Sequence, residues 1–245
     1  MLALEINNLN FRYKGQANLC LSNINLQINE SERFGLFGPN GAGKTTLIYL
    51  MTGLLQPISG ESMVFGRKIK QRNGVKRLFG FVPQDFAFYE ELSLEHNLEY
   101  FGAWSGIDKN EIKQRTDELL EILGLTEYRK IAIKKFSGGM KRRVNLAIGV
   151  IHKPRILFLD EPTVGVDVQT RHAIINYLKQ LNSEGTTLIY TSHLLKEAED
   201  LCEHIALIDE GKVIANNSLV NLLKEYNESG LEGLFLKLTG KAYRD

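Results

Sequence analysis

The feature that most constrains this chain is a glycine-rich loop that follows a short apolar run. Phe34–Phe37 is followed by Gly38-Pro-Asn-Gly-Ala-Gly43-Lys44-Thr45-Thr46, which has the spacing G-x-x-x-x-G-K-[ST]. Glycines let a backbone wrap around phosphate groups without Cβ clashes, and the amides then point inward as donors. A helix predicted from Thr45 to Leu54 adds its positive N-terminal end. The loop therefore predicts a phosphate site where a strand meets a helix.

The side chains of this loop predict a nucleotide ligand. Lys44 neutralises the β and γ oxygens of a nucleoside triphosphate, and the Thr45 hydroxyl coordinates Mg²⁺. The alternative is a glycine-rich turn without a ligand, but the four fixed positions match by chance with a probability of only about 0.01 over such a chain. The residues that we expect to contact the nucleotide here are Gly38, Pro39, Asn40, Gly41, Ala42, Gly43, Lys44, Thr45 and Thr46.

A second pattern is an apolar run that ends in two acids. Ile156–Leu159 is followed directly by Asp160 and Glu161. Asp160, at the end of the predicted strand, holds Mg²⁺ through water, and Glu161 takes the proton from the attacking water as a general base. An acidic turn after a strand is common by itself. Downstream of a phosphate loop in an α/β chain, the catalytic interpretation is favoured.

Hydrophobic periodicity divides the chain into three parts. Residues 1–28 alternate apolar and polar side chains, which predicts antiparallel strands with one buried face. Residues 93–152 are predicted to be mostly helical, and from residue 155 strands and helices alternate, as they do around a parallel sheet. We predict an α/β core made of residues 1–90 and 155–217, a helical insertion at about residues 91–154, and a short helical tail over residues 218–245.

Charge and apolar content exclude several classes of protein. The chain has 30 Lys and Arg against 29 Asp and Glu, a net charge of +1, whereas nucleic-acid-binding domains usually carry a clear basic excess. We therefore expect no nucleic-acid partner. The basic run Lys141-Arg142-Arg143 is interpreted as a solvated helix face, or as added positive field near a nucleotide. No secretory signal and no span of about 20 apolar residues is visible. Since Cys20 and Cys202 form no disulfide pattern, we predict a cytoplasmic protein.

A third motif makes a family resemblance visible. In Phe136-Ser137-Gly138-Gly139-Met140, Ser-Gly-Gly opens a predicted helix and offers a second anion site. Together with the phosphate loop and the two acids, this motif resembles the nucleotide-binding subunit of ABC transporters. The resemblance covers about residues 1–215. It implies a P-loop NTPase core of the RecA-like type, with an N-terminal antiparallel β-subdomain and an inserted α-helical subdomain.

The resemblance also implies roles for further residues and a second copy of the chain. In the ABC family the Ser-Gly-Gly loop closes on the γ-phosphate held by a partner, so Ser137, Gly138 and Gly139 imply a dimer, with a homodimer expected. The remaining matches are Tyr13 (stacking on adenine, or alternatively a tyrosine that caps a strand), Gln84 (sensing Mg²⁺ and the attacking water), Asp167 (signalling across the dimer) and His193 (bonding the γ-phosphate). Lys44, Gln84, Glu161 and His193 are thus the expected catalytic residues, and Thr45, Gln84 and Asp160 the expected metal-binding residues.

Two features resemble the ABC-2-type exporter branch of this family. Met140 stands where many members have Gln, and the ending Leu231–Gly240 is similar to that of the subgroup. The resemblance implies a subunit that hydrolyses ATP with Mg²⁺ and drives export through a separate membrane permease at the inner face of the membrane. The aromatic stretch Asp85–Tyr89 is expected to receive a helix of that permease, or alternatively to be a buried cluster. A soluble ABC ATPase acting on ribosomes or nucleic acid, and an importer ATPase, remain as alternatives.

Overall fold

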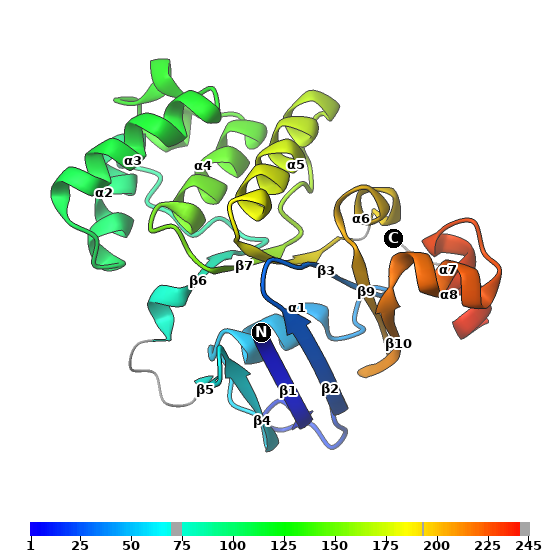
Figure 1. The fold of residues 1–245 in the computed structure, drawn as a ribbon. Helices are drawn as coiled ribbons and strands as arrows, with labels where there is room; N and C mark the ends of the chain where they lie inside the picture. Colours follow the sequence, from blue (N-terminus) through cyan, green and yellow to red (C-terminus); the bar gives the residue numbers. More distant parts are fainter. Residues whose placement is uncertain (70–74, 193, 241–245) are drawn as a thin grey trace.

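Two β-sheets organise the computed structural model, which describes residues 1–69, 75–192 and 194–240 (Figure 1). The smaller sheet is antiparallel and runs in the order β2 (Leu21–Asn29), β1 (Leu2–Phe11), β4 (Ser59–Val64), β5 (Arg67–Lys68). The larger sheet runs in the order β10 (Lys212–Ser218), β9 (His204–Asp209), β3 (Arg33–Phe37), β8 (Thr187–Thr191), β7 (Ile156–Asp160), β6 (Phe79–Val82). All of its pairings are parallel except that of β9 with β10. The chain is therefore a mixed α/β protein, as the sequence predicted.

The helices are grouped by where they lie along the chain. They are α1 (Lys44–Met51), α2 (Leu94–Trp104), α3 (Lys109–Ile122), α4 (Gly138–Val150), α5 (Val168–Ser183), α6 (Leu195–Leu201), α7 (Leu219–Tyr226) and α8 (Leu231–Thr239). The helices α2, α3 and α4 lie together at one side of the larger sheet, between β6 and β7 in the chain (Figure 1). Each of the three begins after a residue whose side chain caps its N-terminus, namely Ser93, Asp108 and Ser137.

The larger sheet separates two hydrophobic cores. Along β7, Ile156 and Phe158 face one core while Leu157 and Leu159 face the other, and all four side chains are fully buried. Strands buried on both faces appear in a sequence as continuous apolar runs, which is why the sequence predicts this strand. One core holds α1 between the two sheets, and the other holds the helices α4, α5 and α6 against the opposite face.

Helix α1 ends three residues before the predicted end at Leu54. Gly53 has a φ of +73°, the left-handed conformation that commonly ends helices. A Cβ added to Gly53 would lie 2.7 Å from Cγ2 of Ile69, so the position also lacks room for a side chain. Leu54 is 61% exposed. The apolar sequence therefore extends beyond the end of the helix, which is why the predicted end is too late.

The C-terminal helices pack against the larger of the two cores, which is the one that holds α4, α5 and α6. The side chains of Leu222 on α7 and of Leu231, Leu234 and Phe235 on α8 are buried in it. The backbone amide of Leu231 donates a hydrogen bond to the Glu199 carboxylate of α6. Residues 219–239 thus cover the outer side of α6 and β10 (Figure 1). Among the described helices, none is both long and apolar enough to cross a bilayer.

Candidate functional site

The parallel sheet brings the predicted residues of distant segments to one edge. The strands β3, β6, β7 and β8 run in the same direction, so their carboxyl ends meet there. The phosphate loop follows β3, Gln84 follows β6, and Glu161 follows β7. His193, which follows β8, lies outside the described residues. Ligands of open α/β sheets bind at this edge, so a ligand site is expected here.

The phosphate loop has a backbone that only glycine fits at its two ends. Gly43 precedes α1 with a φ of +106°, a conformation that other residues rarely adopt. At Gly38 the constraint is space, because an added Cβ would lie 2.0 Å from the carbonyl oxygen of Ile208 on β9. The loop is therefore held against the neighbouring strand, and the first amides of α1 have no partner within the helix.

Lys44 lies inside this loop with its ammonium group against the backbone. Its side chain is 6% exposed, and Nζ donates to the carbonyl oxygens of Gly38 at 2.7 Å and Pro39 at 3.2 Å. Burial lowers the pKa of Lys44, while the charges of Glu161 and Asp160 act in the opposite direction. A cation whose hydrogen bonds go to carbonyl oxygens of a buried loop is suited to an anionic ligand, whose charge would compensate it.

The two acids at the end of β7 have different surroundings. Asp160 is 1% exposed and accepts a hydrogen bond from the Thr191 hydroxyl at 2.8 Å. Burial raises the pKa of Asp160, and hydrogen bonds from Thr191 and Thr45 oppose that rise. The bond with Thr45 joins the two residues that were predicted to hold Mg²⁺. The acid is thus a buried oxygen ligand next to a hydroxyl, which is the donor chemistry that Mg²⁺ prefers.

Glu161 has a strained backbone that aims its side chain at the loop after β6. Its φ is +51°, a left-handed conformation that is uncommon for a residue with a Cβ and that recurs at functional sites. The Glu161 amide is held by the carbonyl oxygen of Thr191 at 3.2 Å. On its side chain, Oε2 accepts a hydrogen bond from Nε2 of Gln84 at 3.3 Å. The structure therefore brings the expected general base and the expected sensing glutamine together.

A cavity of about 550 Å³ lies between the phosphate loop, Gln84 and Glu161. Its lining includes half of the predicted site residues, namely Tyr13, Asn40, Gly41, Gly43, Lys44, Thr45, Thr46, Gln84 and Glu161. Tyr13 stands at its rim, 37% exposed, with its hydroxyl 2.9 Å from that of Thr46. Cys20 and Val164 also line the cavity, and sequence reasoning did not predict them. The predicted pairing of the first two strands is the signal that could have indicated Cys20. The Cys20 amide donates a hydrogen bond to the carbonyl oxygen of Phe11, two residues before Tyr13.

The predicted Ser-Gly-Gly loop lies elsewhere. Ser137 is exposed and caps α4, accepting a hydrogen bond from the Met140 amide at 3.3 Å. Ser137, Gly138 and Gly139 are not among the residues that line the 550 Å³ cavity. Asp167 lies close to this loop, because a Cβ added to Gly139 would be 3.7 Å from its Oδ2. The structure thus places Ser137–Gly139 and Asp167 together on the surface, apart from the phosphate loop.

Asp167 has a structural task in the chain itself. It caps α5, accepting hydrogen bonds from the Thr170 amide at 2.9 Å and the Thr170 hydroxyl at 2.8 Å. These bonds hold the pKa of Asp167 below its ordinary value. Its carboxylate is therefore ionised and fixed in direction at the surface.

The interpretation of the basic run as a solvated helix face was wrong. Arg142 is 8% exposed and donates to the carbonyl oxygens of Gln84 and Val164. Arg143 donates to the carbonyl oxygen of Leu123 at 2.7 Å, and Lys141 pairs with Glu90 at 2.7 Å. The periodicity of charge could not show that backbone carbonyls of distant segments lie within reach of these side chains.

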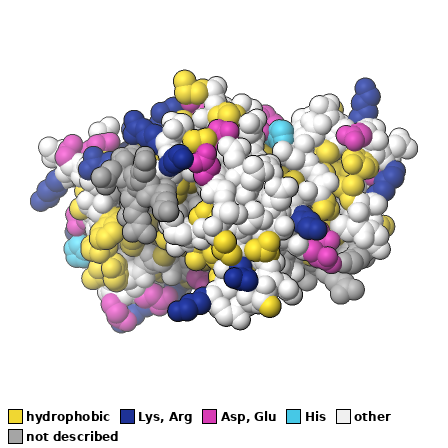
Figure 2. Space-filling view, turned by 90° about the horizontal axis from the view of Figure 1, so that it is seen from below, with side chains coloured by type: hydrophobic (Ala, Val, Ile, Leu, Met, Phe, Trp, Pro, Cys, Tyr) yellow, Lys and Arg dark blue, Asp and Glu magenta, His cyan; other side chains and the backbone are white. Residues whose placement is uncertain are grey.

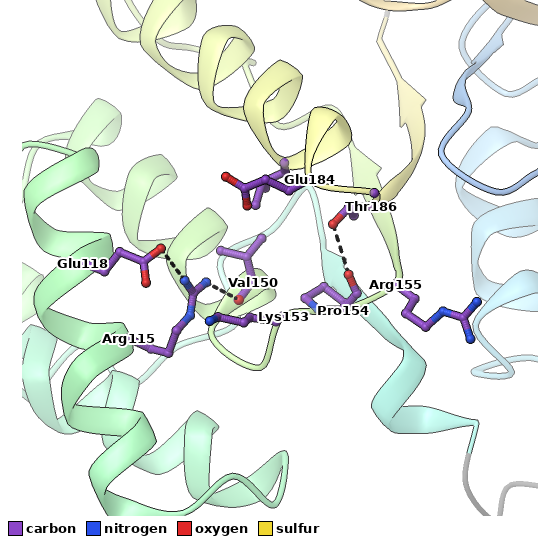
Figure 3. A pocket seen from close by; sticks show the side chains of 10 residues that line it. Arg115, Glu118, Val150, Lys153, Pro154, Arg155, Glu184 and Thr186 are labelled. Atoms are coloured by element: carbon purple, nitrogen blue, oxygen red, sulfur yellow. Dashed lines mark hydrogen bonds and ion pairs between the residues drawn. The ribbon is translucent and has the colours of Figure 1, made fainter.

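A smaller cavity, of about 260 Å³, lies at the opposite edge of the sheet, before β7 and β8 (Figure 3). Its buried cation, Arg115, pairs with Glu118 at 2.6 Å and donates to the carbonyl oxygen of Val150 at 3.1 Å. The Thr186 hydroxyl donates to the carbonyl oxygen of Pro154, while Arg155 points away from the group (Figure 3). The charge of Arg115 is therefore already compensated within the chain.

Comparisons with known proteins agree with this geometry. A family model described as "ABC transporter" matches residues 21–164. A linearmycin resistance ATP-binding protein of Bacillus subtilis is 46% identical over 200 residues, which is 81% of this chain and 64% of that protein. A Nod factor export ATP-binding protein of Cupriavidus metallidurans is 41% identical over 196 residues, which is 80% of this chain and 65% of that protein. The chain thus spans somewhat less than two thirds of the length of these curated relatives.

Solved structures of similar fold extend over nearly the whole chain. The structure of an ATP-binding subunit of an ABC transporter has a TM-score of 0.89 at 27% identity and covers 97% of this chain and 99% of its own. A dimeric post-hydrolysis state of an ATP-binding cassette bound to ADP and Pi has a TM-score of 0.81 at 27% identity and covers 88% of this chain and 98% of its own.

Proposed function

The chain belongs to the ABC transporter family, and we propose that it is an ATP-binding and ATP-hydrolysing subunit that drives export through a separate membrane permease. One observation carries the proposal. The phosphate loop with Lys44, together with Glu161 and Gln84, lines one cavity at the carboxyl edge of a parallel sheet, and the buried Asp160 is hydrogen-bonded to Thr45 of that lining. The names of the relatives, which include linearmycin resistance and Nod factor export, support export rather than import.

In this proposal the cavity holds the triphosphate of ATP. The loop amides and Lys44 neutralise the phosphate oxygens, so Lys44 exchanges its bonds to backbone carbonyls for bonds to the ligand. Glu161 takes the proton of the attacking water. Gln84, whose Nε2 lies 3.3 Å from Oε2 of Glu161, orients that water. His193 would contribute a hydrogen bond to the γ-phosphate from the loop after β8. The protein supplies position and charge rather than a covalent intermediate.

The residues around Asp160 fit Mg²⁺. The Thr45 hydroxyl and the Asp160 carboxylate are joined by a hydrogen bond and supply hard oxygen ligands. In the described part of the chain, no three His, Cys, Asp or Glu side chains are arranged to hold a metal ion. Phosphate oxygens and waters would therefore complete the coordination, as is usual for Mg²⁺. When bound, the ion would neutralise charge that develops on the phosphates.

A second copy of the chain would complete the site. Ser137, Gly138 and Gly139 form a helix N-terminus at the surface, which is an anion site that the chain's own cavity does not use. We propose that this loop closes on the ATP of the partner, with Asp167 beside it at the interface and Tyr13 stacking on adenine. The dimeric structure with ADP and Pi, which is similar to this chain, supports the arrangement.

The permease is proposed to dock in an apolar groove at the side of the helical insertion. The groove has a volume of about 730 Å³ and is lined by apolar side chains such as Leu54, Phe81, Phe101 and Trp104. Trp104 is 77% exposed. Figure 2 shows hydrophobic side chains gathered at the side of the molecule where Figure 1 places α2. Exposed apolar patches of this kind mark interaction sites.

The aromatic stretch Asp85–Tyr89 adjoins this groove, and its rings differ in exposure. Phe86 is 38% exposed and Tyr89 is 48% exposed, whereas Phe88 packs against the larger core. Ala87 lines the groove itself. Phe86 and Tyr89 are therefore the rings available to a permease helix, and Phe88 supports them, with its ring 5.2 Å from that of Phe86.

The test of hydrolysis is phosphate release by the purified chain with ATP and Mg²⁺. Glu161→Gln should lower kcat by about 100-fold or more, because the general base is lost. The matched control is Glu121→Gln, which removes an exposed carboxylate of α3 and should leave turnover unchanged. The Glu161→Gln chain should also elute as a dimer only with ATP. A wild-type chain without ATP turnover would overturn the proposed function.

The test of the partner is affinity capture of tagged Glu161→Gln chain from detergent-solubilised cells with ATP present. Loss of the general base should retain the closed dimer together with the protein it serves. Recovery of a polytopic membrane protein, weakened by Phe86→Ala together with Trp104→Ala, supports the transport function. Recovery of ribosomes or nucleic acid without a membrane protein contradicts it and favours the soluble class of ABC ATPase.

A further inference from the structure

Arg142 occupies a junction between three segments of the molecule. It lies on α4, five residues after Ser137, and its side chain is 8% exposed. Its guanidinium donates from Nη1 to the carbonyl oxygen of Gln84 and from Nε to the carbonyl oxygen of Val164 at 3.2 Å. The same group lies over the ring of Phe86, 4.8 Å from its centroid. One side chain thus joins the helix of the Ser-Gly-Gly loop to the loops that follow β6 and β7.

The rest of the same helix face follows the segment that leads to Gln84. One turn further along α4, Asn145 is 2% exposed and donates from Nδ2 to the carbonyl oxygen of Pro83 at 2.9 Å. One more turn along, a Cβ added to Gly149 would lie 2.5 Å from Cγ2 of Val82. These positions are spaced i, i+3 and i+7, so they share one face of the helix. The segment of residues 82–84 is therefore held against α4 at successive points, through the Val82 side chain and the carbonyl oxygens of Pro83 and Gln84.

We propose that Arg142 is a positioning residue for Gln84. It holds the backbone of Gln84 to α4 on one side and to the Val164 carbonyl of the core on the other, so that the Gln84 amide stays beside Glu161. This inference rests on the proposed function. It predicts that the chemistry at Glu161 depends on the position of the helical insertion through one guanidinium, and not only on the loop that contains Gln84.

The chemistry of the site requires arginine. Two carbonyl oxygens from different loops are bonded by different nitrogens of one planar group, which a lysine ammonium at the end of a flexible chain cannot reproduce. Burial lowers the pKa of Arg142, and the charges of Asp85 and Glu161 oppose this. Arginine nevertheless remains charged, so its bonds to the two carbonyls are charge-assisted.

The neighbouring residue provides a matched control. Arg143 is on the same helix and belongs to the same basic run, and it also donates to a backbone carbonyl, that of Leu123 at 2.7 Å. Leu123 follows α3 within the helical insertion and lies outside the nucleotide cavity. Arg143→Gln therefore removes a similar bond and an equal charge without touching the segment of Gln84.

The experiment measures kcat and KM for ATP of the purified chain with Arg142→Gln, Arg142→Lys and Arg143→Gln. We expect Arg142→Gln to lower kcat by about tenfold with KM changed less than about twofold, because a small misplacement of a catalytic group costs turnover rather than binding. Arg142→Lys should lower kcat by about fivefold, since one of the two bonds is lost. Arg143→Gln should leave kcat within about twofold of wild type, and a larger fall for it would overturn the assignment.

A double-mutant cycle with Gln84→Ala separates positioning from a purely structural role. If Arg142 acts through Gln84, adding Arg142→Lys to Gln84→Ala should lower kcat no further than Gln84→Ala alone. Multiplication of the two effects overturns the inference, as does an Arg142→Lys chain with wild-type kcat. If Arg142→Gln does not fold, Arg142→Lys and the cycle decide. Binding of a fluorescent ATP analogue without turnover in the wild-type chain would be a failure of the proposed function instead.

Discussion

The two ends of the larger sheet treat charge in opposite ways. At the amino ends of the strands, charged side chains are paired with one another across the surface: Arg33 with Glu203, His204 with Glu32 at 3.1 Å, and Arg155 with Glu30 at 3.3 Å. At the carboxyl ends, Lys44 and Asp160 are buried. Burial lowers the pKa of Lys44 and raises the pKa of Asp160, so it favours the neutral form of each group. One end is arranged to stabilise the fold, and the other keeps charges whose compensation we assign to a ligand.

This difference has a signature in pH. The hydrogen bond that His204 donates to Glu32 raises the pKa of His204, so the stability it contributes is present below about pH 6.5 and is lost as pH rises through the folded pKa. Burial raises the pKa of Asp160, so the fold loses stability as pH rises above 3.8 and the acid ionises. Both groups therefore make the fold less stable as pH rises, but substitution of Asp160 should remove a cost that is present at high pH, whereas substitution of His204 should remove a gain that is present at low pH.

The largest effect is expected for Lys44→Ala at the carboxyl end. Loss of the buried cation should lower ATP turnover by about 10²–10³-fold, because it removes charge stabilisation of the transferred phosphate. The melting temperature without nucleotide should change little, because burial disfavours the charged form of Lys44 and so offsets its favourable contacts. Phosphate release and a melting curve on the same sample measure both. Lys68→Ala, at an exposed ion pair with Glu61, is the control. A large fall in melting temperature would show that Lys44 is mainly structural.

Asp160→Asn is expected to raise stability while lowering activity. The neutral amide avoids the cost of a buried carboxylate, so the free energy of unfolding should rise by about 1 kcal/mol at pH 7.5 without Mg²⁺ or nucleotide. The gain should shrink at pH 5, because the wild-type acid is then closer to its protonated form. Urea denaturation at the two pH values measures the difference. Equal stability of both chains at pH 7.5 would contradict the contrast between the two ends.

His204→Gln tests the amino end with the opposite sign. Gln keeps hydrogen bonding toward Glu32 and Asn216 but not the charge. We expect a loss of about 0.5–1 kcal/mol at pH 5.5 and almost none at pH 8.5, where the wild-type imidazole is neutral. Urea denaturation at both pH values provides the measurement, with the exposed His172→Gln as control. A loss that does not depend on pH would indicate packing rather than charge, since His204 also stacks on Phe34.

The smallest effect is expected for Glu203→Gln. The pair of Glu203 with Arg33 is partly exposed, and such ion pairs usually contribute less than about 1 kcal/mol. We expect a loss of about 0.3 kcal/mol at low salt that disappears in 1 M NaCl because of screening. Melting curves across a salt series measure it. A loss that persists at high salt would place this pair with the buried interactions.

The sequence by itself determined the features that depend on neighbours along the chain. The phosphate loop, the buried strand that ends in Asp160 and Glu161, and the start of α4 at Ser137 were all recognisable, because their residue types and spacing are local. The alternation of strands and helices also predicted a parallel sheet. Helix ends were less accurate, as at Gly53, where conformation rather than apolar content ends α1.

Only the tertiary structure decided how these local pieces meet. It turned Glu161 toward Gln84 through a left-handed backbone, placed Cys20 in the cavity, and set the Ser137 loop apart from the phosphate loop. It also buried Arg142 against two carbonyls from other segments, where charge pattern had suggested a solvated face. The physical reason is the same in each case. Burial and hydrogen-bond partners are set by residues far away in sequence, and a pattern of neighbours contains no information about them.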